Sequence, residues 1–461
     1  MGGLSKKASL FSQQQGTSED TLILDGGGLL FDSPRITVHK IKQAEINAQG
    51  IIKAYNLIGY DAVGITGQDL AAGYDFLNKI KKESNFAWLS ANLYLKDSVL
   101  PLFQPFLSKM IGNQAITIIG LTGPGLDGDR QLEEKIVIRP WQEILPDLLN
   151  TSKIKNTFII LLTDLDRKSC QEITELYPSI NLIIQAANQD ENISPVPLNE
   201  TTLLTSTGRK GKFTGLLSIS WINGGRWDGR LTAELSRKKI ARDRVDLLID
   251  QYTGNPEKTE LIKKLQEKRT ILSAELAQLE LKTSQLEQAS YSIKFSAIES
   301  TLPDAPDVSQ IVEETKRQVN RTGQDEGINR QSPDRSKIIS SSFIGWKVCG
   351  SCHSAQVASW QTTPHFASFA GLTDTEQQFN RNCIPCHVTG VFSGSEEYAL
   401  ELPEELQLVG CEACHGPGRK HQMDPKGNPT IPPDQVLCLR CHNPENDDSF
   451  DFVRDKAKVH P

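Results

Sequence analysis

Cys349-Gly-Ser-Cys352-His353 is the first of four stretches in which two cysteines stand three positions apart and a histidine follows at once. Together the four stretches hold eight of the nine cysteines in a chain of 461 residues. In chain order, the motifs are Cys349-Gly-Ser-Cys352-His353, Cys383-Ile-Pro-Cys386-His387, Cys411-Glu-Ala-Cys414-His415 and Cys438-Leu-Arg-Cys441-His442. We number them first to fourth. A single chemistry that uses two thiols and one imidazole must explain them.

This spacing is typical of c-type haem attachment. Two thiols along one turn can each form a thioether to a haem vinyl group, and the next residue supplies an imidazole as the proximal ligand of the iron. Zinc ribbons and disulfide frameworks also use such cysteine pairs, but neither needs a histidine after every pair. The sequence therefore predicts four covalent haems, whose proximal ligands are His353, His387, His415 and His442.

The remaining histidines limit how many irons can have two histidine ligands. Of the eight histidines, three beyond the motifs lie in the same segment and are the candidate distal ligands: His365, His421 and His460. His39 lies far upstream, and Met423 is a weaker alternative ligand. We expect three haems with two histidines and one with an open position. The second motif is the expected open one, because no histidine follows it before the next motif.

Length and composition define the class of protein. A chain of this length is expected to form two or three domains. Apolar residues make up 38%, and no run approaches the ~18 apolar residues of a membrane span, so we expect a core-forming chain that does not cross a membrane. The net charge of −7 argues against a nucleic-acid binder driven by basicity.

From residue 21 to about residue 221, short β-rich runs alternate with amphipathic helices, which predicts an α/β layered domain. Strands are expected at 21–25, 61–65, 86–90, 115–119, 158–162 and 182–184, with helices at 39–57 and 70–82. The ninth cysteine, Cys170, is expected to be an ordinary structural or surface residue at a helix start.

Between 231 and 289 the strand signal disappears and a coiled-coil seam takes its place. Apolar positions from Ile262 to Leu286 step by alternating three and four residues, which is typical of such a seam. Because Gly254-Asn-Pro256 interrupts the pattern, we predict a helical hairpin with its turn there, available for self-association. A lone surface helix is the alternative. Residues 290–298 are expected to rejoin the sheet, and 303–319 to form a helix.

A polar segment then separates two parts of the chain. Residues 321–340 are rich in Gly, Ser, Asn and Asp, as interdomain linkers are. The predicted organisation is an α/β domain over 1–320, a linker over 321–340 and a small, mostly α-helical tetrahaem cytochrome domain over 341–461.

The first domain resembles the 5'-nucleotidase branch of the calcineurin-like metallophosphoesterases. The segments that carry the resemblance are Gly2-Gly-Leu-Ser-Lys-Lys-Ala8, Leu24-Asp-Gly-Gly-Gly-Leu-Leu-Phe31, Tyr60-Asp-Ala-Val63, Leu89-Ser-Ala-Asn92 and Leu302-Pro-Asp-Ala-Pro-Asp307. The resemblance implies an α/β metallophosphoesterase-like fold over about 300 residues.

The metal ligands of that family are missing. The positions that correspond to them are Gly28, Gly67, Gln68, Asp69, Asp164, Ala187 and Gln189. A two-metal phosphoesterase needs bridging carboxylate and imidazole ligands to hold both ions and activate water. The remaining carboxylates, Asp25, Asp61, Asp69 and Asp164, do not make such a set. We therefore expect no zinc, manganese or magnesium in this domain, and no hydrolysis.

The second domain resembles the tetrahaem cytochrome c family of nitrifying bacteria. Trp360 and His365 follow the first motif, Gly416-Pro-Gly418 and His421 follow the third, and His460-Pro461 follows the fourth. The resemblance implies electron transfer through the haems, with one five-coordinate iron.

The haem reading also predicts a compartment. Because covalent haem attachment in bacteria takes place outside the cytoplasm, we expect a periplasmic or cell-surface protein. Residues 1–20 contain no apolar signal segment, and the resembling family begins with a strand before its Gly-Gly-Leu helix. We therefore expect the signal peptide and the first strand to lie upstream of Met1.

The expected function is extracytoplasmic electron transfer, with the phosphoesterase-like domain as a scaffold. From residue 341 onward, nine Lys and Arg face fifteen Asp and Glu, a net charge of −6 that would attract basic redox partners. Basic cytochromes and membrane quinol-linked complexes are the expected partners. Two alternatives are a haem enzyme that acts on a small nitrogen or sulfur species at an open iron, and a 5'-nucleotidase-type hydrolase.

Overall fold

A computed structural model describes most of the chain. The described residues are 3–15, 20–125, 135–151, 153–186, 191–221, 225–227, 229–252, 258–285, 289–329, 342–391, 402–443, 446–447 and 449–459. The chain divides into two compact units. The first unit comprises 1–35 and 51–309, and the second comprises 36–50 and 310–461. No helix among the described residues is both long and apolar enough to cross a bilayer.

The first unit is built on a mixed sheet, whose described strands follow the order β10-β11-β9-β8-β6-β5. The central strands β6, β8, β9 and β11 run parallel, and both edge strands run antiparallel to their neighbours. Their bounds are β5 Phe106–Ile111, β6 Gln114–Leu121, β8 Phe158–Thr163, β9 Ile180–Gln185, β10 Ile193–Pro197 and β11 Leu203–Ser206. The central strands are nearly continuous apolar runs, as strands covered on both faces must be.

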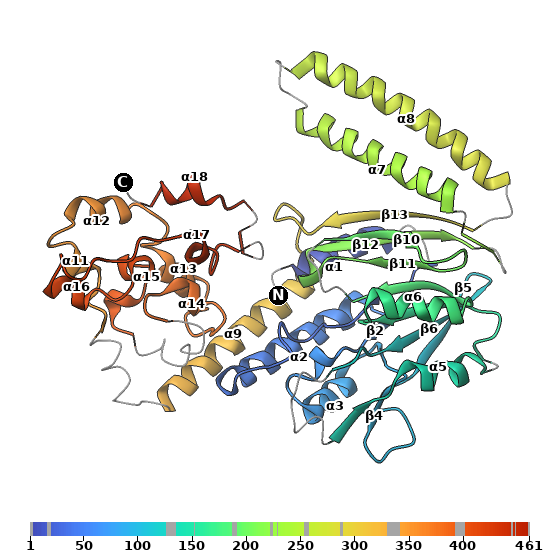
Figure 1. Ribbon diagram of the computed structural model, residues 1–461, viewed down its shortest axis with the longest axis horizontal. Helices are drawn as coiled ribbons and strands as arrows, with labels where there is room; N and C mark the ends of the chain where they lie inside the picture. Colours follow the sequence, from blue (N-terminus) through green and yellow to red (C-terminus); the bar gives the residue numbers. More distant parts are fainter. Residues whose placement is uncertain are drawn as a thin grey trace. The chain divides into compact units, whose positions relative to one another are not determined.

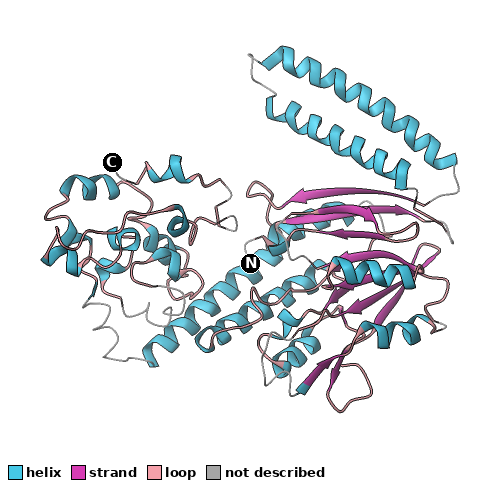
Figure 2. Cartoon of the chain, in the orientation of Figure 1, coloured by secondary structure: helices cyan, strands magenta, loops and turns pink. Residues whose placement is uncertain are grey.

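Alternate residues of the central strands face two different layers. Ile159 and Leu161 pack against helices α5 (Trp141–Leu149) and α6 (Arg167–Leu176). Phe158, Ile160 and Leu162 face the opposite way, onto smaller sheets. One is the parallel sheet β1-β2-β3, formed by Leu24–Asp25, Ala62–Gly64 and Ala87–Leu89, and the other is the pair β12 (Phe213–Ser220) and β13 (Ser290–Ala297). The layered α/β architecture is as predicted (Figures 1 and 2).

The remaining elements of the first unit are short, apart from a helical hairpin. They are α1 Leu4–Gln15, η2 Gly67–Leu70, α3 Tyr74–Glu83, β4 Leu93–Leu95, β7 Ile136–Ile138 and η3 Arg209–Gly211. The hairpin consists of α7 (Gly229–Tyr252) and α8 (Thr259–Gln285), which lie side by side (Figure 1). Its predicted turn at 254–256 lies outside the described residues. Leu235 of α7 packs on Leu276 and Leu279 of α8, which are two positions of the predicted seam.

The second unit consists of short helices joined by irregular segments (Figure 2). After α9 (Pro306–Asn329), which begins in the first unit, they are α11 Trp346–Cys349, α12 Ser354–Trp360, α13 Ser368–Asp374, α14 Ile384–His387, η6 Glu404–Leu406, α15 Cys411–His415, α16 Arg419–Met423, α17 Gln435–Cys438 and α18 Phe452–Lys456. The apolar cores are small. One gathers around Phe343 and Ile384, the other around Trp360.

Three boundaries differ from the predictions. Helix α9 continues to Asn329, so residues 321–329 of the expected linker are helical, and 330–341 lie outside the described residues. Strand β13 pairs with β12 in a separate sheet instead of rejoining the main one. The segment 36–50, which contains η1 (Val38–Lys40) and the start of α2 (Ile41–Ile58), belongs to the second unit. His39 therefore lies in the same unit as the four motifs.

Candidate haem-binding site

Each motif forms a single helical turn, so that its cysteines share one side. In the first motif the amides of Cys352 and His353 both donate to the Cys349 carbonyl, at 3.2 and 3.0 Å. In the fourth, the amides of Cys441 and His442 donate to Cys438 at 3.1 and 2.9 Å. Residues three and four apart on such a turn are neighbours, which places two thiols and one imidazole around a common space.

The imidazoles of three motifs are oriented through Nδ1. Nδ1 of His387 lies 2.6 Å from the Ser368 carbonyl oxygen, and Nδ1 of His415 lies 3.1 Å from the Ile431 carbonyl oxygen. Nδ1 of His442 lies 2.9 Å from a carboxylate oxygen of Asp447. A histidine that donates its Nδ1 proton to such an acceptor keeps a lone pair on Nε2 for a metal, and the acceptor fixes the ring orientation. This geometry fits proximal iron ligands.

Two of the four motif imidazoles, those of His353 and His442, each face one of the candidate distal histidines. The ring centroids of His353 and His421 are 6.2 Å apart, with planes inclined by 23°. Those of His365 and His442 are 5.9 Å apart, inclined by 65°. Imidazole nitrogens bind first-row metals at about 2.0–2.1 Å, so two rings on opposite sides of one metal have centroids roughly 6 Å apart. Both pairs match that spacing.

Two of the distal candidates, His421 and His365, each have one feature that suits a metal ligand. Nδ1 of His421 lies 3.0 Å from the carbonyl oxygen of Asn428, which leaves Nε2 for a metal. Burial lowers the pKa of His365, and the nearby charge of His442 lowers it further. A neutral imidazole is the form that binds a metal, so burial of His365 favours ligation.

The other candidate ligands are placed less favourably or lie outside the described residues. Among the described histidines, none pairs with the His387 ring in the way that the two pairs above do. His460 lies outside the described residues. Met423 is 79% exposed. His39 is buried in η1, with Nε2 3.4 Å from the Thr37 hydroxyl.

The cysteines show which motifs are neighbours. A hydrogen bond between the thiols of Cys349 and Cys411 raises the pKa of Cys349 and lowers that of Cys411. In the same way, a hydrogen bond with Cys441 lowers the pKa of Cys386 to about 7. The first motif therefore adjoins the third, and the second adjoins the fourth.

The two pairs of motifs are linked through the third and fourth. Burial, followed by the nearby Cys438 thiol, raises the pKa of Cys414 to about 11. The attachment turns therefore neighbour one another in the order first, third, fourth, second. Haems attached to them would lie close enough together to form a chain.

Glu412, inside the third motif, joins that motif to the segment before the first. Its side chain is buried, and its carboxylate accepts hydrogen bonds from the amides of Ile344 (3.0 Å), Gly345 (2.8 Å) and Gly418 (2.7 Å). Three amide donors satisfy a buried carboxylate that would otherwise be costly to bury. A cavity of about 290 Å³ lies beside this junction, lined by Val348 of the first motif's helix and by Gln422, next to His421.

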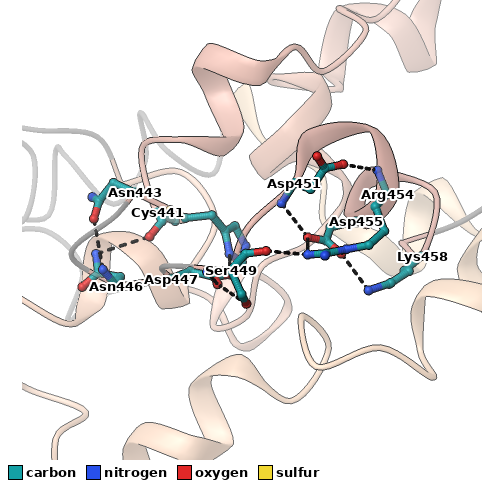
Figure 3. Close-up of polar contacts among 10 residues, drawn as sticks. Cys441, Asn443, Asn446, Asp447, Ser449, Asp451, Arg454, Asp455 and Lys458 are labelled. Carbon is teal, nitrogen blue, oxygen red and sulfur yellow. Dashed lines mark hydrogen bonds and ion pairs between the residues drawn. The ribbon is translucent and has the colours of Figure 1, made fainter. Parts of the chain in front are cut away.

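A compact set of polar contacts follows the fourth motif (Figure 3). The side chain of Asn446 donates to the Cys441 carbonyl at 3.3 Å, and the hydroxyl of Ser449 donates to Asp447, the residue that orients His442. Further along, Arg454 forms two hydrogen bonds with Asp455 and holds the pKa of that carboxyl well below its usual range. These contacts hold the segment that leads to His460.

In the first unit, the remaining carboxylates are engaged by the protein itself. Asp69 is fully buried and accepts hydrogen bonds from the amides of Gly28, Leu30 and Thr66 and from the Thr66 hydroxyl, at 2.9 to 3.1 Å. Asp25 accepts from the Tyr55 hydroxyl at 2.8 Å. In the described part of the chain, no group of three or more His, Cys, Asp or Glu residues is arranged to hold a metal ion. Ala187 and Gln189 lie outside the described residues.

Sequence reasoning named the candidate ligands but missed what orients them. The acceptors at Ser368 and Ile431 are backbone carbonyls, which leave no trace in the sequence. Glu412 had a signal, because it is a charged residue enclosed within a motif. Cys170 is buried in the core of the first unit, and burial raises the pKa of its thiol to about 12, as expected for a structural residue.

Comparisons with known proteins agree with both resemblances. Residues 348–416, which include the first three motifs, match the family described as cytochrome c554 and c-prime. The chain is 36% identical over 98 residues to cytochrome c-554 of Nitrosomonas europaea, covering 18% of this chain and 41% of that protein. It is 32% identical over 108 residues to a 5'-nucleotidase of Vibrio parahaemolyticus, covering 23% of this chain and 18% of that protein.

Among solved structures, sulfate thiohydrolase SoxB of Thermus thermophilus is similar over 68% of this chain and 46% of its own, with 14% identity and a TM-score of 0.47. The chain thus spans less than half of the length of the curated relatives named above. The two resemblances are confirmed, and the cytochrome family implies c-type haem in the C-terminal part.

Proposed function

We propose that this protein transfers electrons outside the cytoplasm through four covalently bound haems. The observation that carries the proposal is the arrangement of histidines around the four motifs. Three motif histidines have Nδ1 bound to an acceptor, and two motif histidines face a second imidazole at the spacing of paired axial ligands. When bound, haem supplies one-electron exchange at its iron.

The chain's own residues attach the haems, orient their ligands and set their order. Eight thiols are available for attachment. His353 with His421 and His442 with His365 would each hold one iron. His460, which lies outside the described residues, remains the third candidate distal ligand. The order of the attachment turns defines a path from the first motif through the third and fourth to the second. A surface with net negative charge would favour basic electron donors or acceptors.

A haem enzyme is the second candidate, and His387 is the observation that favours it. Its Nδ1 is fixed by the Ser368 carbonyl, and among the described histidines none faces the ring of His387 or that of His415. Of these two motifs, only the second has no histidine between it and the next motif. An iron with one open position could bind a small nitrogen or sulfur species. The same open position also occurs in electron carriers, so coordination alone does not establish catalysis.

Mass spectrometry of the protein matured outside the cytoplasm tests the proposal first. The expected mass is that of the polypeptide plus four haems, and fewer haems would contradict the proposal. Electron paramagnetic resonance of the oxidised protein should then show a high-spin signal from about one haem in four. Turnover of hydroxylamine, nitrite or sulfite that requires His387 would favour the enzyme.

The first unit is proposed to be a scaffold without hydrolase activity. The chain replaces the bridging metal ligand by Gly28 and occupies Asp69 with backbone donors, so the groups that hold two ions are lost. The purified protein should not hydrolyse 5'-nucleotides or bis(p-nitrophenyl) phosphate with added Mn²⁺ or Zn²⁺. Metal-dependent turnover abolished by Asp164→Asn would overturn this part.

A further inference from the structure

The loop over 377–382, which leads into the second motif, is held by a buried glutamine from a distant part of the chain. Gln43 on α2 is 3% exposed. Its amide nitrogen donates to the Phe379 carbonyl at 2.8 Å, and its amide oxygen accepts from the Arg381 amide at 3.0 Å. One side chain thus fixes the backbone on either side of Asn380, two to four residues before Cys383.

Helix α9 holds the same loop from a second direction. The side-chain oxygen of Asn320 accepts from the Phe379 amide at 2.7 Å, and the amide of Gln43 also donates to the Val319 carbonyl at 3.0 Å. Gly323 lies inside the helix at this contact. A Cβ there would lie 2.1 Å from the Phe379 carbonyl oxygen and 2.5 Å from the Gln43 amide nitrogen. Close approach of the loop therefore explains a glycine where a helix would not favour one.

Charged groups complete the contact. Arg381 is 1% exposed, and its guanidinium lies 3.6 Å from the carboxylate of Glu326, whose other oxygen lies 3.4 Å from the ammonium of Lys42. Breaking a buried ion pair leaves an uncompensated charge, so this contact resists loosening.

The contacts given above for the first, third and fourth motifs come from within 342–459, through Glu412, Ile431 and Asp447. The second motif also has a contact from this range, through the Ser368 carbonyl. The second motif adds contacts from 36–50 and 310–329, segments that belong to the stretch resembling a phosphoesterase. We propose that a clamp positions the second haem and sets its reduction potential; this inference rests on the proposed function. The clamp consists of Gln43, Asn320, Gly323 and the Glu326–Arg381 pair.

The physical basis is the control that a protein exerts over a haem through solvent exposure, nearby charge and hydrogen bonding. A loosened loop would admit water beside the second haem and move the buried guanidinium. Both changes favour the oxidised iron and so lower the reduction potential. The other three haems are attached by segments that the clamp does not touch, so their potentials should stay the same.

The test uses the full, haem-loaded chain with Gln43→Ala and Asn320→Ala, and with Gln318→Ala as the matched control. Gln318 lies on the same helix but bonds only to Glu314 among the contacts found for it. Hydrogen–deuterium exchange of the peptide over 377–387 should be at least tenfold faster in the two clamp variants. A redox titration should show one of four waves shifted downward, and His387→Met identifies that wave as the second haem.

Several outcomes separate the clamp from the proposed function. Fewer than four haems in the wild-type protein contradicts the proposed function, and the exchange measurement still tests the clamp. If the protein carries four haems but both clamp variants show unchanged amide exchange and unchanged redox waves, the clamp is refuted. An equal shift of all four redox waves would also refute it. If the Gln43→Ala protein does not accumulate, the Gln43→Glu variant provides the test of the clamp. It keeps the acceptor for the Arg381 amide, loses the donor to the Phe379 and Val319 carbonyls and adds a negative charge, so the clamp predicts a downward shift of the same wave alone.

Discussion

Glu412 shows how a single side chain can hold two attachment motifs together. Its carboxylate accepts three backbone hydrogen bonds, from Ile344, Gly345 and Gly418. In Glu412→Gln one acceptor oxygen becomes a donor that faces backbone amides. Because a hydrogen bond to a charged group contributes about 1.5–3 kcal/mol, we expect the second unit to lose about that much stability.

Thermal unfolding followed at the haem Soret band measures this loss. Glu405→Gln is the matched control, because Glu405 is partly exposed and its carboxylate pairs with the ammonium of Lys347 at 3.4 Å, away from the three amides that Glu412 binds. The stability of the control should change by less than about 0.5 kcal/mol. Equal unfolding temperatures for the Glu412 variant and the wild type would show that the three amide contacts do not stabilise the fold.

Asp164 predicts a pH dependence of the first unit. Burial raises its pKa to about 6, opposed by the amide of Gly123 and assisted by the charge of Asp69. The folded state therefore binds this proton more tightly than the unfolded chain, whose ordinary value is 3.8. The contribution of this group to the free energy of unfolding is greatest below about pH 4. It falls as the pH rises to about 6 and stays low above that value.

Asp164→Asn should remove this dependence, since the amide oxygen can still accept from Gly123. At pH 7 we expect the variant to be more stable than the wild type by about 1–2 kcal/mol, and at pH 4 to be no more stable. Urea unfolding monitored by the tryptophans of the first unit, at pH 4 to 7, measures both. If the unfolding free energies of the wild type and of Asp164→Asn depend on pH in the same way, the raised pKa of Asp164 is refuted. Exposed Asp97→Asn is the control and should follow the wild-type profile.

At the scale of elements, the helical hairpin carries a prediction of its own. Leu276 is 3% exposed and packs with Leu235 and Leu279, whereas Ile271 on the same helix is 59% exposed. Removing a buried leucine side chain costs about 2–5 kcal/mol, so Leu276→Ala should loosen the hairpin. Faster amide exchange over 259–285 is the expected sign, with Ile271→Ala as the matched control. Equal exchange in both variants would indicate that the hairpin does not depend on this seam.

The elements that the sequence predicted well are those whose apolar residues recur at a regular spacing or form an unbroken run. Strands β8 and β9 are buried apolar runs, and the α8 seam keeps its three-four spacing, so both were found. Strand β5 alternates weakly because much of it is exposed, and it was missed. Helix α9 was expected to end near 319 because a polar stretch with Gly323 follows. The glycine instead serves a close contact with another segment, which local pattern does not reveal.

At the scale of the whole molecule, the sequence predicted the components of the site but not their pairing. The four motifs and the three candidate distal histidines are short local signals. The facing pairs, His353 with His421 and His365 with His442, join residues far apart in the chain. The contribution of 36–50 to the second unit was also unforeseen, because Gln43 acts through backbone atoms of a loop more than three hundred positions away.

The pairing leads to a prediction about spin states. If His421 and His365 are axial ligands, replacing either by Ala leaves one further iron with a single protein ligand. A five-coordinate ferric haem is high-spin, so each variant should raise the high-spin share of the resonance signal from about one haem in four to about two. The double variant should reach about three.

The change should also be selective, and this selectivity distinguishes ligation from a general loss of structure. His421→Ala should convert only the haem of the first motif, and His365→Ala only that of the fourth, while mass spectrometry still finds four haems. Met423→Ala removes a side chain that is 79% exposed and two residues from His421, so it should leave the spectrum unchanged. An unchanged low-spin signal in His421→Ala would refute the first pair. A high-spin increase in Met423→Ala would instead indicate that this segment offers its sulfur to an iron, and that the His353–His421 spacing does not mark a ligand pair.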